Sequence, residues 1–249
     1  LLPILYLLTT NYAKASSDSI RHNRTGYFIH LSKQDGLAAD KVLDILQDKY
    51  GFIWLATLNG LSRYDGNRFI NYLHHESDIN SITDNTVTAL TEDSQGNLWI
   101  GTRNGLNRYD RTTDKFIRYT TANGLKNNYI KALYADQEKN IWMETAEGYL
   151  TRYSIYEDQW THTKHNPGVS EGEHYYWHIY EDSLKNLWIG GRTLHGIRYN
   201  KESHEMTSVP TWSEKGMPLE SAFFVQDTEG NIYSSSIGSL QRFDTTLQK

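Results

Sequence analysis

The stretch DSQGNLWIGTRNGLNRYD, from Asp93 to Asp110, decides the fold, because the chain repeats its pattern five times. In each copy an aspartate stands six residues before an aromatic residue, and an arginine beside Tyr or Phe follows the aromatic residue. Chance does not keep three markers in register over copies spaced about 45 residues apart. The marker residues are Asp48, Asp93, Asp136, Asp182 and Asp227, with Trp54, Trp99, Trp142, Trp188 and Tyr233.

A period of about 45 residues, with short apolar runs between turns of Gly, Asn and Asp, is typical of a β-propeller whose blades have four antiparallel strands, a to d. In the second copy we expect these strands over residues 86–92, 98–102, 106–110 and 116–120. Strand b (LWIGT) is apolar at consecutive positions, as in a sheet that is covered on both faces. The predicted fold is therefore all-β, with about five blades centred on the four tryptophans and Tyr233.

Each marker has a predicted structural role. The aspartate can accept hydrogen bonds from backbone N–H groups of the a–b turn. The tryptophan can form an apolar wedge between adjacent blades, which is worth about 2 to 3 kcal/mol by area. The arginine can lie along an aromatic face of the neighbouring blade or pair with an aspartate.

The strings GFIWLATLNGLSRYDGNRF (Gly51–Phe69) and GNLWIGTRNGLNRYD (Gly96–Asp110) resemble the two-component regulator propeller repeat. The resemblance covers essentially all of the predicted propeller, including residues 27–48, and is less specific for the ligand than for the repeat. Repeat three departs from the pattern at Met143–Thr145, and repeat five has three serines after Tyr233.

That resemblance implies the periplasmic sensor region of a hybrid two-component histidine kinase of the Bacteroidetes type. Such a region binds an oligosaccharide and signals to a downstream kinase, usually as a homodimer that carries two seven-bladed propellers. No kinase module lies within these 249 residues, so the resemblance implies a binding function and no catalytic residues for the chain itself. The expected partners are the oligosaccharide and the downstream propeller and kinase parts.

The N-terminal segment resembles a processed export signal. An apolar run over residues 1–8 precedes the triplet Ala13-Lys14-Ala15, as in the core and cleavage site of a signal peptide. We therefore expect a signal-peptide remnant over 1–15, a linker over 16–26 and the propeller over 27–249, in the periplasm. The alternative is a buried N-terminal strand or helix. The chain has no cysteine, which excludes thiolate chemistry and disulfides.

The ends of the repeat array leave two alternatives open. Residues 27–31 (YFIHL) are predicted to form a lone strand d, and the last repeat ends near Asp244 without its own strand d. The first strand would complete the last blade if five blades closed into a ring. We favour the other alternative, in which the chain is an incomplete part of a seven-bladed propeller.

A ligand is expected on the face formed by the b–c loops and the d–a connections, because loops vary while strands keep the scaffold. Aromatic rings there could stack on sugar rings, and Asn and Arg could bond sugar hydroxyls. The alternative for each aromatic residue, including Trp177, is packing within strand a. The predicted ligand contacts are Arg103, Asn104, Asn128, Tyr129, His174, Tyr175, Trp177, Arg192 and His195.

Other functional classes find little support. The net charge of −5 gives no basic field for nucleic acid. His162, His165, His174 and His178 fall on different strands and a Pro-Gly loop, so no metal site or cofactor is expected. Two alternatives stay open: a secreted glycoside hydrolase or polysaccharide lyase with loop acids such as Glu147, and a non-catalytic interaction scaffold.

Overall fold

In a computed structural model of the chain, residues 28–165, 177–191, 195–210, 223–236 and 239–243 are described. The predicted signal segment (1–15) and linker (16–26) lie outside these ranges. Two short 3₁₀ helices, η2 (Lys33–Asp35) and η3 (Thr121–Asn123), accompany a set of strands. In the described part of the chain, no helix has the length and apolar character needed to cross a membrane.

The strands form five antiparallel sheets in sequence order. The first sheet consists of β1 (Val42–Gln47), β2 (Ile53–Thr57), β3 (Gly60–Tyr64) and β4 (Phe69–Tyr72). The second consists of β5 (Val87–Glu92), β6 (Leu98–Thr102), β7 (Gly105–Asp110) and β8 (Lys115–Tyr119). The third consists of β9 (Ile130–Ala135), β10 (Asn140–Thr145), β11 (Tyr149–Ser154) and β12 (Gln159–Lys164). The last two are β13 (His178–Glu181), β14 (Asn186–Gly190), β15 (His195–Asn200) and β16 (Met206–Pro210); and β17 (Phe223–Gln226), β18 (Ile232–Ser236) and β19 (Ser239–Phe243).

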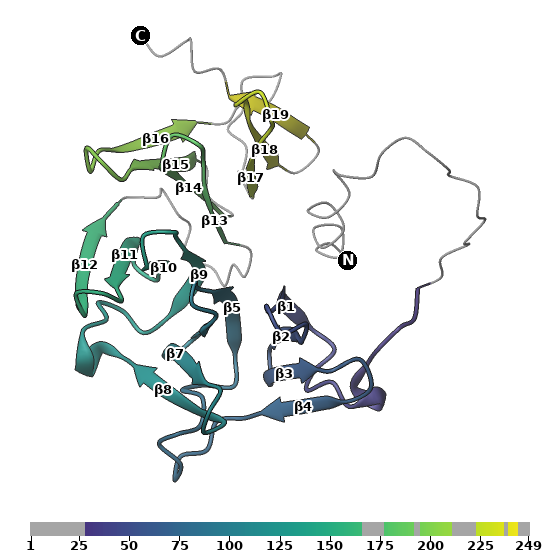
Figure 1. The fold of residues 1–249 in the computed structure, drawn as a ribbon. Helices are drawn as coiled ribbons and strands as arrows, with labels where there is room; N and C mark the ends of the chain where they lie inside the picture. The colour runs from purple at the N-terminus through teal and green to yellow at the C-terminus, as the bar shows by residue number, and fades with distance from the viewer. Residues whose placement is uncertain (1–27, 166–176, 192–194, 211–222, 237–238, 244–249) are drawn as a thin grey trace.

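The five sheets are the blades of a propeller and follow one another around an arc (Figure 1). The first strand of each blade faces the middle of the arc, and the strand pairs β1–β5, β5–β9, β9–β13 and β13–β17 are in contact. In Figure 1 the first and fifth blades are not adjacent, so the described residues form an open arc. The predicted all-β propeller of about five blades is confirmed, and a total of seven blades stays a prediction.

The predicted lone strand at the N-terminus is wrong for the residues that are described. Residues 28–31 are in no strand, and the side chains of Phe28 and Ile29 are 90% and 71% exposed. A strand needs a partner edge, and Figure 1 shows the fifth blade on the far side of the opening. Within the described residues the fifth blade has three strands, and residues 244–249, which follow the third, lie outside the described ranges.

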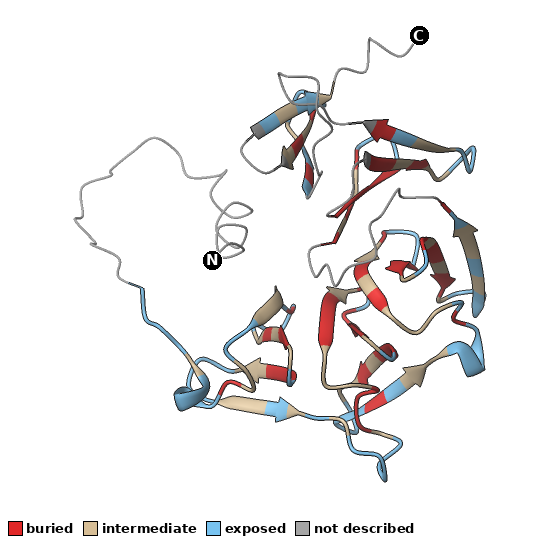
Figure 2. Ribbon diagram, turned by 180° about the vertical axis from the view of Figure 1, so that it is seen from behind, coloured by how far each residue is buried: buried red, intermediate tan, exposed pale blue. Residues whose placement is uncertain are grey.

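The tryptophans form the predicted wedges between blades. The ring of Trp54 lies 5.1 Å from that of Tyr109 in strand c of the next blade. The same contact recurs at each later junction described, for the pairs Trp99–Tyr153, Trp142–Tyr199 and Trp188–Phe243 at 5.8, 5.5 and 5.1 Å. Burial is concentrated in the inner and middle strands of the blades (Figure 2). The core is therefore a series of apolar layers between neighbouring sheets.

The spacing of six residues between aspartate and tryptophan follows from a hydrogen bond that joins them. Trp99 Nε1 donates to Asp93 Oδ2 at 2.9 Å, while Asp93 Oδ1 accepts from the backbone N–H groups of Gln95 and Asn97. The predicted turn role is thus confirmed, and the indole contact is an addition. It recurs at 2.7 to 2.8 Å for Trp54, Trp142 and Trp188, and Tyr233 Oη donates to Asp227 at 3.1 Å.

The predicted stacking partner of the repeat arginine is wrong. Arg63 and Arg108 lie over the tryptophans of their own blades, at 5.6 and 5.8 Å from the ring centres. Strands b and c pair each arginine directly with that tryptophan, for example Trp54 with Arg63, so the nearest aromatic face is within the sheet. Arg63 still reaches the next blade, because its Nη1 donates to Tyr109 Oη at 3.1 Å.

Candidate functional site

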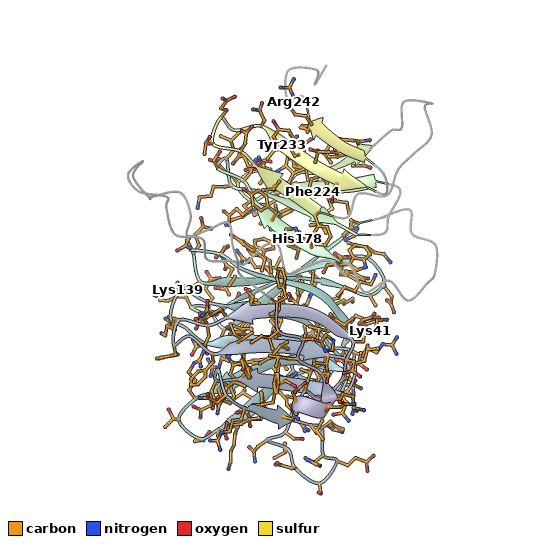
Figure 3. The ribbon with its side chains drawn as sticks, turned by 90° about the vertical axis from the view of Figure 1, so that its right-hand side faces the viewer. Lys41, Lys139, His178, Phe224, Tyr233 and Arg242 are labelled. Atoms are coloured by element: carbon orange, nitrogen blue, oxygen red, sulfur yellow. The ribbon has the colours of Figure 1, made fainter. Side chains whose placement is uncertain are left out.

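The blades have two faces, and the predicted ligand face is one of them. Lys41, just before β1, and Lys139, in the turn between β9 and β10, lie at opposite edges of the blades (Figure 3). The N–H of Leu58, in the first b–c loop, donates to the carbonyl of Lys41, so b–c loops and d–a connections share the Lys41 edge. We call this edge the loop face.

Four of the predicted ligand contacts come together on the loop face, between the second and third blades. The guanidinium of Arg103 lies 5.6 Å from the ring centre of Tyr129. Asn128 Nδ2 donates to Asn104 Oδ1 at 3.2 Å. The two residues of each pair come from opposite sides of the junction, since residues 103–104 form the β6–β7 loop and residues 128–129 precede β9.

Backbone contacts fix the connection that carries these side chains. The carbonyl of Tyr129 accepts a hydrogen bond from the N–H of Ala146 in the β10–β11 loop, and its own N–H donates to Asn127 Oδ1 at 2.8 Å. Asn128 Oδ1 accepts from the N–H of Thr121 at the start of η3. Leu125, which is 4% exposed, anchors the same segment in the core. The loop is therefore held at both ends and at its middle.

The same connection extends the site onto the third blade. Asn127 Nδ2 donates to Glu147 Oε1 at 3.2 Å. The Nζ atoms of Lys126 and Lys164 lie 5.9 and 5.2 Å from the ring centre of Tyr149. We call the whole set the polar strip, which consists of Arg103, Asn104, Lys126, Asn127, Asn128, Tyr129, Glu147, Tyr149 and Lys164.

The other predicted contacts do not join this strip in the described residues. His174, Tyr175 and Arg192 lie outside those residues, and of His195 only the backbone is described, as the first residue of β15. The side chain of Trp177 is 8% exposed and belongs to the core cluster between the third and fourth blades. Packing within strand a therefore accounts for Trp177 in this structure.

A buried pair that the sequence did not single out lies nearby in the third blade. Glu144 Oε2 and His165 Nε2 are 2.8 Å apart, and both side chains are almost fully buried. Burial raises the pKa of Glu144, while the hydrogen bond with His165 and the charge of Lys131 oppose this shift. Glu144 Oε1 and His165 Nδ1 have no hydrogen-bond partner among the described residues. The sequence did carry a signal for this pair, because the third repeat has the charged Glu144 at the position where the second repeat has Gly101.

The histidines do not assemble a metal site in the part of the chain that is described. His162 lies between Thr151 Oγ1 and the carbonyl of Gly124, at 3.0 and 3.1 Å, apart from the pair of His165. Burial lowers the pKa of His178 to about 4. Across the described ranges, no group of three or more His, Asp or Glu side chains could hold a metal ion.

A cavity on the loop face lies at the first blade. This cavity of about 270 Å³ is bordered by apolar and amide side chains. Asn71 is already engaged, because its Nδ2 donates to the carbonyl of Gly36 and its Oδ1 accepts from Ser62. The amide of Asn71 is therefore used within the first blade. The lining residues are Lys33, Gly36, Leu37, Ala38, Asn59, Asn71 and Leu73.

Comparisons with known proteins agree with this architecture. The model of the two-component regulator propeller family matches residues 36–59 and 81–104. Histidine kinase P4 of Formosa agariphila is 44% identical over 48 residues, which are 19% of this chain and 4% of that protein. The chain therefore spans only a small part of this curated relative.

Two solved structures from B. thetaiotaomicron show the same fold. The extracellular domain of the predicted hybrid two-component system BT3049 is 25% identical, with a TM-score of 0.72, and the match covers 89% of this chain and 31% of that one. The corresponding domain of BT4673 is 19% identical, with a TM-score of 0.56 and coverage of 86% and 33%. The repeat pattern, the family model that matches residues 36–59 and 81–104 and the likeness to the BT3049 domain show that the chain carries two-component regulator propeller repeats.

Proposed function

We propose that the chain is the ligand-sensing propeller of a hybrid two-component sensor and binds an oligosaccharide on the polar strip. Its relatives are extracellular domains of hybrid two-component systems, so we place it in the periplasm, after export directed by residues 1–15. In the full-length protein, a histidine kinase outside this chain would receive the signal, within a homodimer. Ligand binding must favour one arrangement of that dimer by differential contacts.

The observation that carries the binding proposal is the convergence of Arg103, Asn104, Asn128 and Tyr129 at one blade junction. Amide groups and a guanidinium can bond the hydroxyls of a sugar, and a half-buried tyrosine ring offers a face for stacking. The strip also bridges two blades, so a ligand bound there contacts both. We assign this site a binding role, in which Glu147 is the one carboxylate of the strip.

Calorimetry with a panel of neutral and acidic oligosaccharides tests this proposal. Tyr129→Ala should weaken the binding of the best panel member by about tenfold or more, because it removes the stacking face. Tyr156→Ala is the matched control, since this tyrosine is 86% exposed in the β11–β12 turn, away from the loop face. Equal effects of both variants, or no binding at all, would contradict the proposal. Release of reducing ends from a polysaccharide would favour the hydrolase or lyase alternative instead.

A further inference from the structure

The polar strip has a charge that differs in sign from that of the whole chain. The chain carries a formal net charge of −5, but the strip contains three cations, Arg103, Lys126 and Lys164, and one carboxylate, Glu147. Local charge of one sign raises the concentration of an oppositely charged ligand near a surface. The sign of the strip therefore favours an anionic ligand.

The two lysines are brought together from separate elements. Lys126 belongs to the connection between η3 and β9, and Lys164 is the last residue of β12. Both are exposed, and both place Nζ within 6 Å of the Tyr149 ring centre. Two ammonium groups from separate elements therefore lie beside the same ring.

The acids among the described residues do not pair with these lysines. Neither Lys126 nor Lys164 makes an ion pair within the described ranges. The nearest acidic member of the strip, Glu147, has one carboxylate oxygen engaged by Asn127 Nδ2 at 3.2 Å. The ammonium groups consequently keep hydrogen-bond donors for a ligand.

We propose that the polar strip recognises an acidic oligosaccharide, with the exposed ammonium groups of Lys126 and Lys164, beside Tyr149, holding a carboxylate or sulfate group of the sugar. This inference rests on the proposed function and adds the chemical class of the ligand. Carboxylate and sulfate offer the lysines the same charge and the same acceptor oxygens. The experiment below distinguishes these two sources.

The test compares saccharides that differ in charge alone. The probes are tetragalacturonate and its methyl ester, together with a chondroitin tetrasaccharide in sulfated and desulfated forms, each titrated into the 249-residue chain at low and high salt. We expect an acidic probe to bind at least about tenfold more tightly than its less charged counterpart, with an affinity that falls as salt rises. Preference for tetragalacturonate over its ester assigns carboxylate recognition. Preference for the sulfated chondroitin form over the desulfated one assigns sulfate recognition.

The double variant Lys126→Gln/Lys164→Gln should lose about tenfold in affinity for the bound acidic probe and most of the salt dependence. The control Lys115→Gln/Lys139→Gln removes the same charge from exposed positions away from the loop face and should bind like the wild type. Unchanged affinity in the strip variant, or equal binding of the two members within both probe pairs, would overturn the inference while the proposed function stood. Failure of all four probes and of the neutral panel would overturn both.

Discussion

Each repeat aspartate couples a turn to a blade junction. In the second repeat, one oxygen of Asp93 organises the a–b turn through two backbone N–H groups, and the other oxygen holds the indole of Trp99. The indole in turn lies against Tyr153 of the next blade. A single buried carboxylate therefore fixes the local turn and aims the side chain that fills the interface.

Asp93→Ala should lower the free energy of unfolding by about 3 kcal/mol, because it leaves the Trp99 N–H and turn amides without their acceptor in a buried site. Urea unfolding followed by tryptophan fluorescence would measure this loss. Asp93→Asn keeps one acceptor oxygen and should lose less. The same substitution at Asp227, which is in a more exposed turn of the fifth blade, should also lose less. A larger loss for Asp227→Ala than for Asp93→Ala would contradict this account.

Sequence reasoning at the residue scale succeeded for the repeat aspartates and tryptophans, but it failed for the stacking partner of the repeat arginines and for the single pair of Glu144 and His165. The turn role of the aspartates and the wedge role of the tryptophans could be predicted because five copies constrain them. Glu144 and His165 occur once, and their pairing joins β10 to the residue just after β12, which no local pattern reveals. Burying the Glu144 carboxylate with one unpartnered oxygen costs free energy, so its presence in the blade needs a physical reason.

At the scale of elements, cations from one blade reach the turn aspartate of the preceding blade. Arg111 Nη1 donates to Asp48 Oδ2 at 2.8 Å, and Lys201 Nζ donates to Asp136 Oδ2 at 2.9 Å. Ile155 occupies the corresponding position at the junction between the second and third blades. Ionic and apolar contacts thus alternate along the arc at the same place in the blade.

Lys201→Met should destabilise the chain by about 3 to 5 kcal/mol, because it leaves buried carboxylates without their counter-charge. Lys201 is nearly buried and also lies within 3.1 Å of Glu138 and Glu181. Burial raises the pKa of Asp136, but hydrogen bonds from Trp142, Asn140 and Lys201 lower it below its usual value overall. The change in urea midpoint between wild type and variant measures the effect.

Lys185→Met is the matched control for this junction. Lys185 contacts the same two glutamates, at 3.3 and 3.6 Å, but its side chain is 52% exposed. Solvent screens such a pair, so the variant should stay within about 0.5 kcal/mol of the wild type. Equal losses for both variants would show that burial does not determine the contribution of these ion pairs.

The strands of the second blade could be predicted to within about one residue, because alternation, turn residues and the repeat are local signals. Residues 28–31 show where such signals fail, since a strand also needs an edge to pair with. The loop-face contacts of Arg103, Asn104, Asn128 and Tyr129 followed from topology, which places their loops on one edge. The lysines beside Tyr149 did not, because long side chains meet through three-dimensional packing that the sequence leaves open.

At the scale of the whole molecule, the first and fifth blades each have a neighbouring blade on one side alone among the described residues. At each described junction, the repeat tryptophan of one blade contacts the aromatic residue in strand c of the next blade. The aromatic residue in strand c of the first blade is Tyr64, and it contacts Phe69 of its own sheet. In the fifth blade Phe223, Val225 and Leu240 are 44%, 41% and 73% exposed. The two end blades therefore bury less apolar surface than the inner ones.

Hydrogen exchange should report this difference. In the 249-residue chain we expect the amides of β6, β7, β10 and β11 to exchange slowest, because their blades have a neighbour on each side. The amides of β18 and β19 should exchange first, since local opening of an end blade breaks one interface and leaves the rest intact. Mass spectrometry of peptic peptides over a time course would measure the order. Uniform protection of all five blades would instead show that the arc unfolds as one cooperative unit, with the end blades as stable as the inner ones.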